Sequence, residues 1–197
     1  MKATNNREIR SVPTNKVADE IRAGGSPTLN ALFETWGAPE PLIVFDPAEA
    51  DMRESRLVTL LRYWRGMPKA MGLPRFQDLD PIDITSALGI VMLLEVLESG
   101  DDYRYLIYGE EIAERFGRNM VGQRTSDIPT HPSVTTLFLA CYRVVIDTRR
   151  PILTEHSAPP QVSATSWRRL VMPLAGDGGQ VERILVGNIP GSWRNPS

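Results

Sequence analysis

The chain has 197 residues, 42% of them hydrophobic, and its 22 Lys and Arg against 24 Asp and Glu give a net charge of −2. This composition indicates one globular domain with short additions, and the balanced charge gives no sign of nucleic acid or an anionic membrane as a partner. The single cysteine excludes an internal disulfide and a thiolate metal site, and no apolar run approaches the ~20 residues of a membrane helix, so we expect a cytoplasmic protein without membrane insertion.

The N-terminal part, residues 1–46, is predicted to be a mobile arm that carries one short helix. Residues 1–25 mix polar, charged and small side chains without sustained periodicity. Ser26 and Pro27 then form the N-cap-plus-proline signature of a helix start. The apolar side chains behind them recur at helical spacing and indicate a short amphipathic helix: Leu29, Leu32, Phe33 and Trp36.

A leading amphipathic helix is predicted over residues 47–65. Asp46 and Pro47 supply a capping residue and a proline at the first helical position. Four apolar side chains recur at i, i+3, i+4 and i+7, which places them on one helical face: Leu57, Leu60, Leu61 and Trp64. Gly66 and Pro68 end the helix.

The remainder of the chain alternates short helices with strands. After an irregular connector and a short helix, two β-branched and aromatic runs at residues 90–97 and 103–108 indicate an antiparallel hairpin. Short helical pieces and a helix of about four turns over residues 134–148 follow. Three strands close the chain, at residues 152–157, 166–174 and 181–189. This order favours an α+β fold with a five-stranded antiparallel sheet and helices on one face.

Several short motifs occur at matching places in this order of elements. They are Leu61-Arg62-Tyr63-Trp64, Leu73-Pro74-Arg75, Asp80-Pro81, Tyr103-Arg104-Tyr105 with Gly109, Gly117, Val121-Gly122-Gln123-Arg124, Arg150-Pro151 and Met172-Pro173-Leu174-Ala175. In order and spacing they resemble the stand-alone PAS-like domain family of alphaproteobacteria, over residues 56–190. Glu110 departs from the small hydroxyl residue expected after Gly109. Residues 1–55 fall outside the resemblance. With the leading helix added, we predict a PAS-like domain over residues 47–190, followed by a C-terminal tail over residues 191–197.

The resemblance also implies a sensory or regulatory module that is not an enzyme and acts through protein–protein interaction. The implied partners are a second copy of the chain, as a homodimer, and a signalling protein such as a histidine kinase or a response regulator. The competing interpretation is a small α+β enzyme of the isomerase or hydratase kind, in which a pocket carboxylate or histidine transfers a proton. An acidic pocket residue with a raised pKa would favour the enzyme, whereas an apolar or closed pocket favours the module.

A PAS-type pocket would lie between the concave face of the sheet and the helices. Its expected walls are Phe116, Phe138, Cys141, Tyr142, Leu170 and Met172. Such walls suit a small apolar ligand or a filled core, and we favour the filled core.

Few residues are suited to metal or nucleophilic chemistry. His131 lies in a loop beside two prolines and is expected to be solvated. His156 lies on the first closing strand at an edge or near a turn, where a lone histidine is expected to be hydrogen-bonded or exposed. Cys141 lies on the apolar face of the longer helix and is expected to fill the core, since its neighbours differ from those of a flavin-binding cysteine. We therefore expect no catalytic residue, no metal, no haem and no flavin.

Charged and glycine-rich patterns give no further site. Gly176-Asp177-Gly178-Gly179 lies between two strands without a following helix, which favours a turn over a phosphate loop. Arg168 and Arg169 are neighbours on a strand, so their side chains point to opposite faces and cannot form one basic patch. Three glutamates after Gly109 are interpreted as a solvated helical face: Glu110, Glu111 and Glu114.

The leading helix is given a specific role by the pattern of the first hairpin strand. That strand is apolar at both odd and even positions, so both faces of the sheet need cover. The stripe formed by Leu57, Leu60, Leu61 and Trp64 is expected to supply it. It would do so by folding onto the domain or by building a homodimer interface near the two-fold axis.

Overall fold

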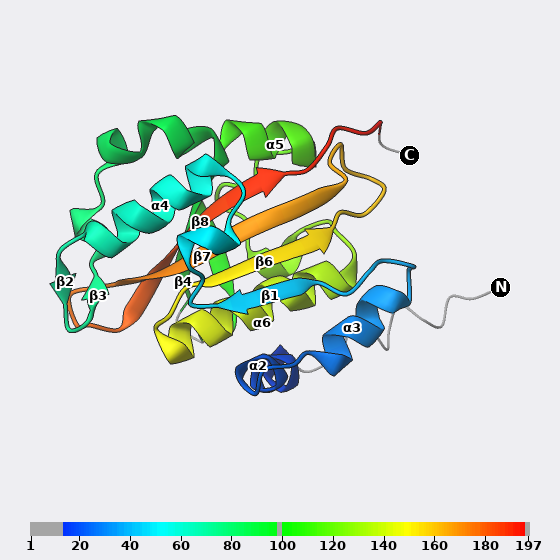
Figure 1. Ribbon diagram of the computed structural model, residues 1–197, viewed down its shortest axis with the longest axis horizontal. Coiled ribbons are helices and arrows are strands. Elements are labelled where there is room, and N and C mark those ends of the chain that lie inside the picture. The colour runs from blue at the N-terminus through cyan, green and yellow to red at the C-terminus, as the bar shows by residue number, and fades with distance from the viewer. Residues whose placement is uncertain (1–13, 98–99, 196–197) are drawn as a thin grey trace.

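The computed structural model describes residues 14–97 and 100–195. A six-stranded antiparallel sheet forms its centre, with the strand order β1-β6-β7-β8-β4-β5 (Figure 1). Its strands are β1 (Leu42–Phe45), β4 (Val91–Val96), β5 (Tyr103–Tyr108), β6 (Ile152–Ser157), β7 (Ser166–Ala175) and β8 (Val181–Pro190). The α+β antiparallel fold and the five predicted strands are confirmed. The number of strands is corrected to six, because β1 pairs with the outer edge of β6.

Helices and short 3-10 turns cover both faces of the sheet. The α-helices are α2 (Thr14–Arg22), α3 (Pro27–Glu34), α4 (Ser55–Gly66), α5 (Glu110–Phe116) and α6 (Pro132–Thr148). The 3-10 turns are η1 (Glu49–Asp51), η2 (Phe76–Asp78), η3 (Pro81–Ile90) and η4 (Thr125–Asp127), and a small separate ribbon consists of β2 (Lys69–Ala70) and β3 (Leu73–Pro74). Helix α6 packs on one face with α2 and α3 against its outer side, while α4 and η3 pack on the other face (Figure 1). The prediction of helices on one face plus a covering leading helix therefore describes the layers correctly.

The sheet separates two apolar cores because successive side chains of a strand point to opposite faces. On β7, Trp167 and Val171 belong to the core under α6, whereas Leu170, Met172 and Leu174 belong to the core under α4. The same alternation places Val186 of β8 on the α6 side and Leu185 on the α4 side.

Helix α4 covers its face of the sheet with the predicted apolar stripe. Leu57, Leu60 and Leu61 have no exposed surface, and Trp64 is 6% exposed. The indole Nε1 of Trp64 donates a 2.8 Å hydrogen bond to the carbonyl oxygen of Pro173 in β7. The close approach requires a glycine on β8, because a Cβ at Gly187 would lie 2.6 Å from Leu60 Cδ1 and 2.7 Å from Leu57 Cδ2.

The leading helix is shorter than predicted. It begins at Ser55 rather than at residue 47, because η1 and an extended stretch through Met52 come first. Asp46, the expected cap, instead adopts a left-handed backbone with a φ of 45° at the end of β1. The side chain of Asp51 accepts a 2.7 Å hydrogen bond from the Ala48 backbone N–H and so closes the η1 turn.

The short helix predicted behind Ser26 and Pro27 is present as α3, but the mobile arm predicted around it over residues 1–46 is ordered structure from Thr14 onward, so mobility is the wrong part of that prediction for the described residues. Helix α2 buries Val17, Ala18 and Ile21 against α6, and α3 buries Leu29 and Phe33 in the same core. A helix of nine residues is marginal alone and is stabilised here by tertiary packing of its apolar face. Residues 1–13 lie outside the described residues.

The C-terminal segment also packs on the domain, which corrects the tail predicted over residues 191–197. Trp193 forms a β-bridge with Ala164, and the Arg194 guanidinium donates hydrogen bonds to the carbonyl oxygens of Ala158 at 2.6 Å and Val162 at 3.2 Å. Residues 196 and 197 lie outside the described part of the chain.

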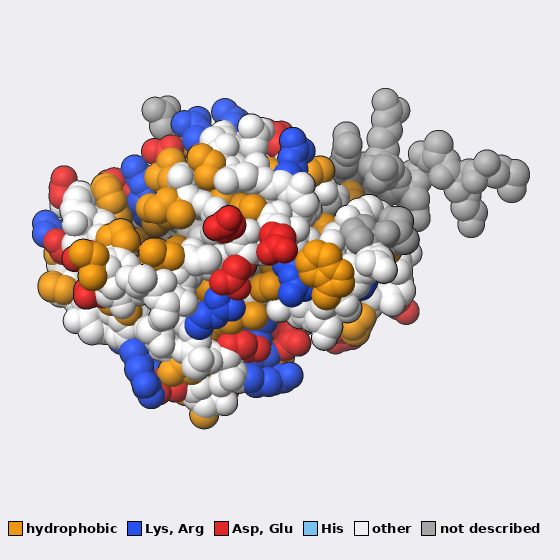
Figure 2. Space-filling model, turned by 90° about the horizontal axis from the view of Figure 1, so that it is seen from above, with side chains coloured by type: hydrophobic (Ala, Val, Ile, Leu, Met, Phe, Trp, Pro, Cys, Tyr) orange, Lys and Arg blue, Asp and Glu red, His pale blue; other side chains and the backbone are white. Residues whose placement is uncertain are grey.

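The surface carries interspersed charges of both signs on the face shown in Figure 2. Among the described residues, no helix combines the length and the apolar character needed to cross a bilayer.

Candidate functional site

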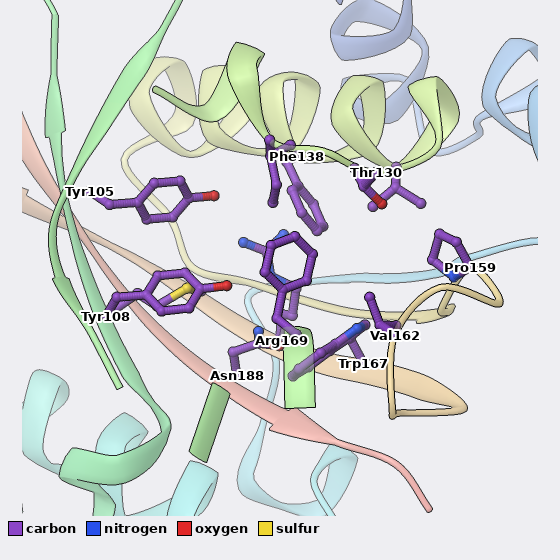
Figure 3. A pocket seen from close by; sticks show the side chains of 13 residues that line it. Tyr105, Tyr108, Thr130, Phe138, Pro159, Val162, Trp167, Arg169 and Asn188 are labelled. Atoms are coloured by element: carbon purple, nitrogen blue, oxygen red, sulfur yellow. The ribbon is translucent and has the colours of Figure 1, made fainter. Parts of the chain in front are cut away.

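A small cavity lies between α6, β5 and the central strands, at the place predicted for a pocket. The centre of a water-sized sphere can move through about 20 Å³ of it, so the cavity has room for a group of a few heavy atoms. Tyr105 and Tyr108 point into it from β5, Phe138 from α6 and Trp167 and Arg169 from β7 (Figure 3). The cavity is also lined by Asn188 of β8, by Phe116 of α5 and by the loop residues Thr130, Pro159 and Val162.

Arg169 brings a buried positive charge to the cavity. It is 1% exposed, and its guanidinium carbon lies 3.7 Å from the ring centroid of Phe138 and 5.3 Å from that of Tyr142. One guanidinium nitrogen donates a hydrogen bond to the Tyr142 hydroxyl, while Nε has no hydrogen-bond partner. Among the described residues, no carboxylate forms an ion pair with Arg169. The hydrogen bond to Tyr142 and the two aromatic faces are thus the direct interactions given for the Arg169 guanidinium among the described residues.

The neighbouring Arg168 shows the opposite arrangement. It points to the α4 face, where its Nε lies 3.2 Å from Glu54 Oε2 and its guanidinium also pairs with the Glu155 carboxylate. A further nitrogen donates to the carbonyl oxygen of Asp51. The prediction that the two arginines point to opposite faces is confirmed, and only Arg168 has acidic partners.

Arg169 is the centre of a polar row that crosses three strands. In the register of the sheet, it lies directly opposite Thr154 on β6 and Asn188 on β8. All three residues are buried, and each has an unpaired polar atom: Thr154 Oγ1, Arg169 Nε and Asn188 Oδ1. Buried polar groups are normally paired with protein or water. Arg169 and Asn188 line the cavity, whereas Thr154 does not, so the unpaired atoms of the first two indicate a place where further polar atoms bind.

The tyrosines around Arg169 remain neutral. Burial raises the pKa of Tyr105 and Tyr142 above the ordinary value of 10.0, and it outweighs the opposing effect of the Arg169 charge. Burial likewise raises the pKa of Tyr108. A protonated phenol can donate a hydrogen bond to an anion, but it contributes no negative charge to balance the arginine.

The predicted pocket walls are only partly those of the cavity. Phe116 and Phe138 line it, as expected. Cys141 and Tyr142 lie in the core under α6 without lining the cavity, although Tyr142 contacts Arg169. The placement of Leu170 and Met172 is wrong, since both lie in the core under α4. The alternation along β7 gives the cavity face to Trp167 and Arg169 instead.

The cavity residues that the sequence analysis missed carry a recognisable signal. Arg169 lies between Trp167 and Val171 at the same parity of an otherwise apolar strand. A charged residue at a core-facing position is rare unless it is paired or functional, so it marks a site even without a motif. Asn188 is a similar break in the apolar pattern of β8.

The two histidines and the cysteine do not line the cavity. His156 is 3% exposed between Phe33 and Phe138, with both ring nitrogens unpaired, which corrects the expectation of an exposed or hydrogen-bonded edge residue. Burial and the nearby Arg169 lower its pKa to about 3. His131 caps α6 and stacks on Trp36 at 5.1 Å, half-buried instead of solvated. Burial raises the pKa of Cys141 to about 12, so its thiol stays protonated in the core.

The acidic residues of α5 are structural in part. Glu111 forms a two-pronged ion pair with Arg56 of α4, at 2.6 and 2.9 Å, and this hydrogen bonding lowers the pKa of the carboxyl. Within the described residues, no group of His, Cys, Asp and Glu could hold a metal ion.

The residues expected at a homodimer interface are used within the chain. Because the apolar stripe of α4 is buried against β7 and β8, it offers no surface to a second copy. The stripe was expected either to cover the sheet of its own chain or to form a homodimer interface, and in the structure it covers the sheet.

Comparison with known proteins gives a family and a few similar solved structures. A family model described as PAS domain matches residues 52–189. The structure described as an RNA-binding Light-Oxygen-Voltage Receptor is similar over 82% of this chain and 42% of that chain, with 11% sequence identity and a TM-score of 0.41. The chain thus spans less than half the length of that neighbour. No curated protein is similar enough to match.

Proposed function

The chain belongs to the PAS domain family, and we propose that it is a sensory or regulatory module that acts through protein–protein interaction. The observation that supports this most is the cavity in the PAS core, which presents unpaired buried polar groups without a carboxylate or a histidine among its lining residues. Binding of a small molecule there would change how α6 packs on the sheet and, through the sheet, the surface offered to a partner.

The two central strands supply a route from the cavity to the opposite face. Asn188 of β8 lines the cavity, and the next residue along the strand, Gly187, lies against Leu57 and Leu60 of α4. On β7, Arg169 lines the cavity while Leu170 belongs to the core under α4. A shift of either strand therefore changes the packing of α4 on the sheet.

The enzyme alternative is less well supported by this geometry. Proton transfer needs an acid or base within hydrogen-bond reach of the substrate, with a pKa near the working pH. The described lining residues offer phenols with raised pKa values and an arginine. These groups bind and orient a ligand instead of exchanging protons with it near neutral pH.

The expected partner is a signalling protein, with a histidine kinase or a response regulator as the proposed class. The test is affinity capture with the tagged full chain from its source cells, quantitative mass spectrometry, and reconstitution of the interaction with purified proteins. The proposal is supported by one such signalling protein that binds the purified chain. It is contradicted if no signalling protein binds and the chain instead turns over a small-molecule substrate.

A homodimer stays a prediction, to be checked by multi-angle light scattering over a range of concentrations. Because the stripe of α4 is buried, a dimer must use other surfaces. A charge substitution in the stripe should therefore lower the stability of the fold and should not act by separating the two subunits.

A further inference from the structure

The unbalanced charge of Arg169 is the feature of the molecule that most needs an explanation. A guanidinium is not deprotonated in proteins, so Arg169 carries its positive charge at 1% exposure. Burial of a charge is costly unless it is paired and hydrogen-bonded. Arg168, one residue earlier, is paired with two carboxylates and hydrogen-bonded to that of Glu155, although its Nε has no hydrogen-bond partner, whereas Arg169 has no carboxylate partner among the described residues.

The surroundings of Arg169 cannot supply the missing negative charge. The hydroxyl of Tyr142, which accepts its hydrogen bond, belongs to a neutral phenol. The faces of Phe138 and Tyr142 attract a cation, but only through their ring quadrupoles. His156, on the far side of Phe138, is neutral or positive at any pH.

The cavity lies where a counter-ion would have to be. Arg169 and Asn188 both line it, and both have an unpaired buried atom. Tyr105 and Tyr108 point their hydroxyls toward the same space from β5 (Figure 3). The guanidinium of Arg169 and the two phenolic hydroxyls are donors suited to oxygen atoms that carry negative charge, whereas the unpaired Asn188 Oδ1 is an acceptor and adds nothing to the binding of an anion.

We propose that this cavity binds a small planar oxyanion, such as formate, acetate or nitrate, as the counter-ion of Arg169. The inference rests on the proposed sensory function, because it names the ligand class of the same cavity. A guanidinium binds a planar oxyanion through two parallel N–H···O bonds, a geometry that a spherical halide cannot match. One negative charge neutralises one arginine, and the small cavity limits the ligand to a few heavy atoms.

The walls explain selectivity and entry. Phe116, Phe138 and Trp167 form apolar sides, which disfavour a second charge on the ligand. Phe116 and Thr130 are half-buried, so the rim between α5 and the loop before α6 reaches the surface. A small anion can therefore reach Arg169 without opening of the main core.

The test measures thermal unfolding of the full chain in a weakly coordinating buffer at constant ionic strength. Formate, acetate, nitrate and chloride are titrated as sodium salts, and formamide and acetamide serve as neutral analogues of matched shape. We expect the planar oxyanions to raise the melting temperature, by roughly 5 to 10 °C at a hundredfold excess over the dissociation constant. The amides and chloride should leave it unchanged. The carboxylates and nitrate are titrated separately, so comparison of their effects on the melting temperature shows which kind of oxyanion the site prefers.

Variants connect the effect to the site. Arg169→Met keeps the length and removes the charge, and it should abolish the response to oxyanions. Arg118→Met removes an exposed charge elsewhere and should keep it. Should Arg169→Met fail to fold, Tyr108→Phe provides the second test, because loss of one hydroxyl donor should weaken oxyanion binding about tenfold or more.

The inference is overturned if acetamide stabilises the chain as much as acetate, or if oxyanions still stabilise Arg169→Met. A response that Arg118→Met abolishes would also overturn it. These results are separable from those for the proposed function. If oxyanions have no effect but a signalling protein still binds, only the proposed ligand class is contradicted. If oxyanions bind but no signalling protein does, the anion site stands and the proposed interaction is contradicted.

Discussion

The contact between α4 and β8 allows a quantitative test of how the leading helix is held. Leu60 has no exposed surface, and its Cδ1 would lie 2.6 Å from a Cβ placed on Gly187. Leu60→Ala should cost about 2–5 kcal/mol through lost burial and the cavity left behind. Gly187→Ala should cost about 1–3 kcal/mol through overpacking, of which the lower backbone entropy of alanine in the unfolded chain offsets about 0.5–1 kcal/mol.

The double variant separates this contact from a general loss of stability. Leu60→Ala removes one of the two methyl groups that the new Cβ would meet, while Leu57 Cδ2 stays at 2.7 Å, so the two changes should together cost about 0.5–1 kcal/mol less than the sum of their separate effects. Urea denaturation followed by circular dichroism measures the free energy of unfolding of all four forms. Gly66→Ala at the end of α4 is the matched control, because a Cβ there meets nothing within 4 Å, and it should be neutral or slightly stabilising. Strict additivity together with an unaffected Gly187→Ala variant would refute the packing described for α4.

Three further predictions concern the buried polar groups. Arg168→Met should lower the free energy of unfolding by about 1.5–3 kcal/mol, since it removes the contacts with two part-exposed carboxylates, of which Glu155 keeps Arg53 at 3.8 Å. Arg169→Met should lower it less, or raise it, in the same urea titration without oxyanions. The pKa of His156 falls from 6.5 to about 3 on folding, so below pH 6.5 the unfolded chain binds the proton first and stability declines as the pH drops toward 3. This decline, up to about 1.4 kcal/mol per pH unit, should be absent from the His156→Phe variant when both are unfolded in urea across that range. Cys141, with no exposed surface, should react with a colorimetric disulfide reagent only after unfolding, and fast reaction of the native chain would contradict its burial.

The strands and the covering helix follow from local patterns that the sequence displays directly. Tyr103–Tyr108 and Ile152–Ser157 begin and end where the β-branched and aromatic runs do. The stripe of α4 was recognisable because four apolar positions recur with helical period, and the both-faced apolar character of β4 required a second layer. These predictions succeeded because each rests on residues close together in the chain.

The N-terminal layer was missed because its elements are stabilised by distant partners. Helix α2 has three buried side chains over nine residues, a pattern too short to distinguish from chance, and they pack on α6 more than one hundred residues later. Strand β1 has four residues and exists as a strand through its pairing with β6. Neither partner can be identified from the short segment itself.

The cavity could be placed by family resemblance, but its chemistry could not. The apolar character of Leu170 and Met172 favours them as walls, and the pair that Arg169 forms with Arg168 in the sequence hides its separate position. The error lies in strand parity: once Trp167 faces α6, Arg169 must face it too, and Leu170 must face α4. The unpaired atoms of Thr154 and Asn188 emerge only when three strands are placed in register.

The strand geometry also explains why a site on one face of this sheet can influence the other. Backbone shifts in a strand move alternate side chains on both faces together, because neighbouring residues share the same peptide units. Asn188 and Gly187 are such neighbours. Asn188 lines the cavity, and Gly187 packs closely against Leu57 and Leu60 of α4. A contact with so little free space cannot absorb a displacement of β8 by compression, so α4 must move with the strand or repack. An anion that draws Arg169 toward itself would displace β7 and the paired β8, and α4 would then shift or repack.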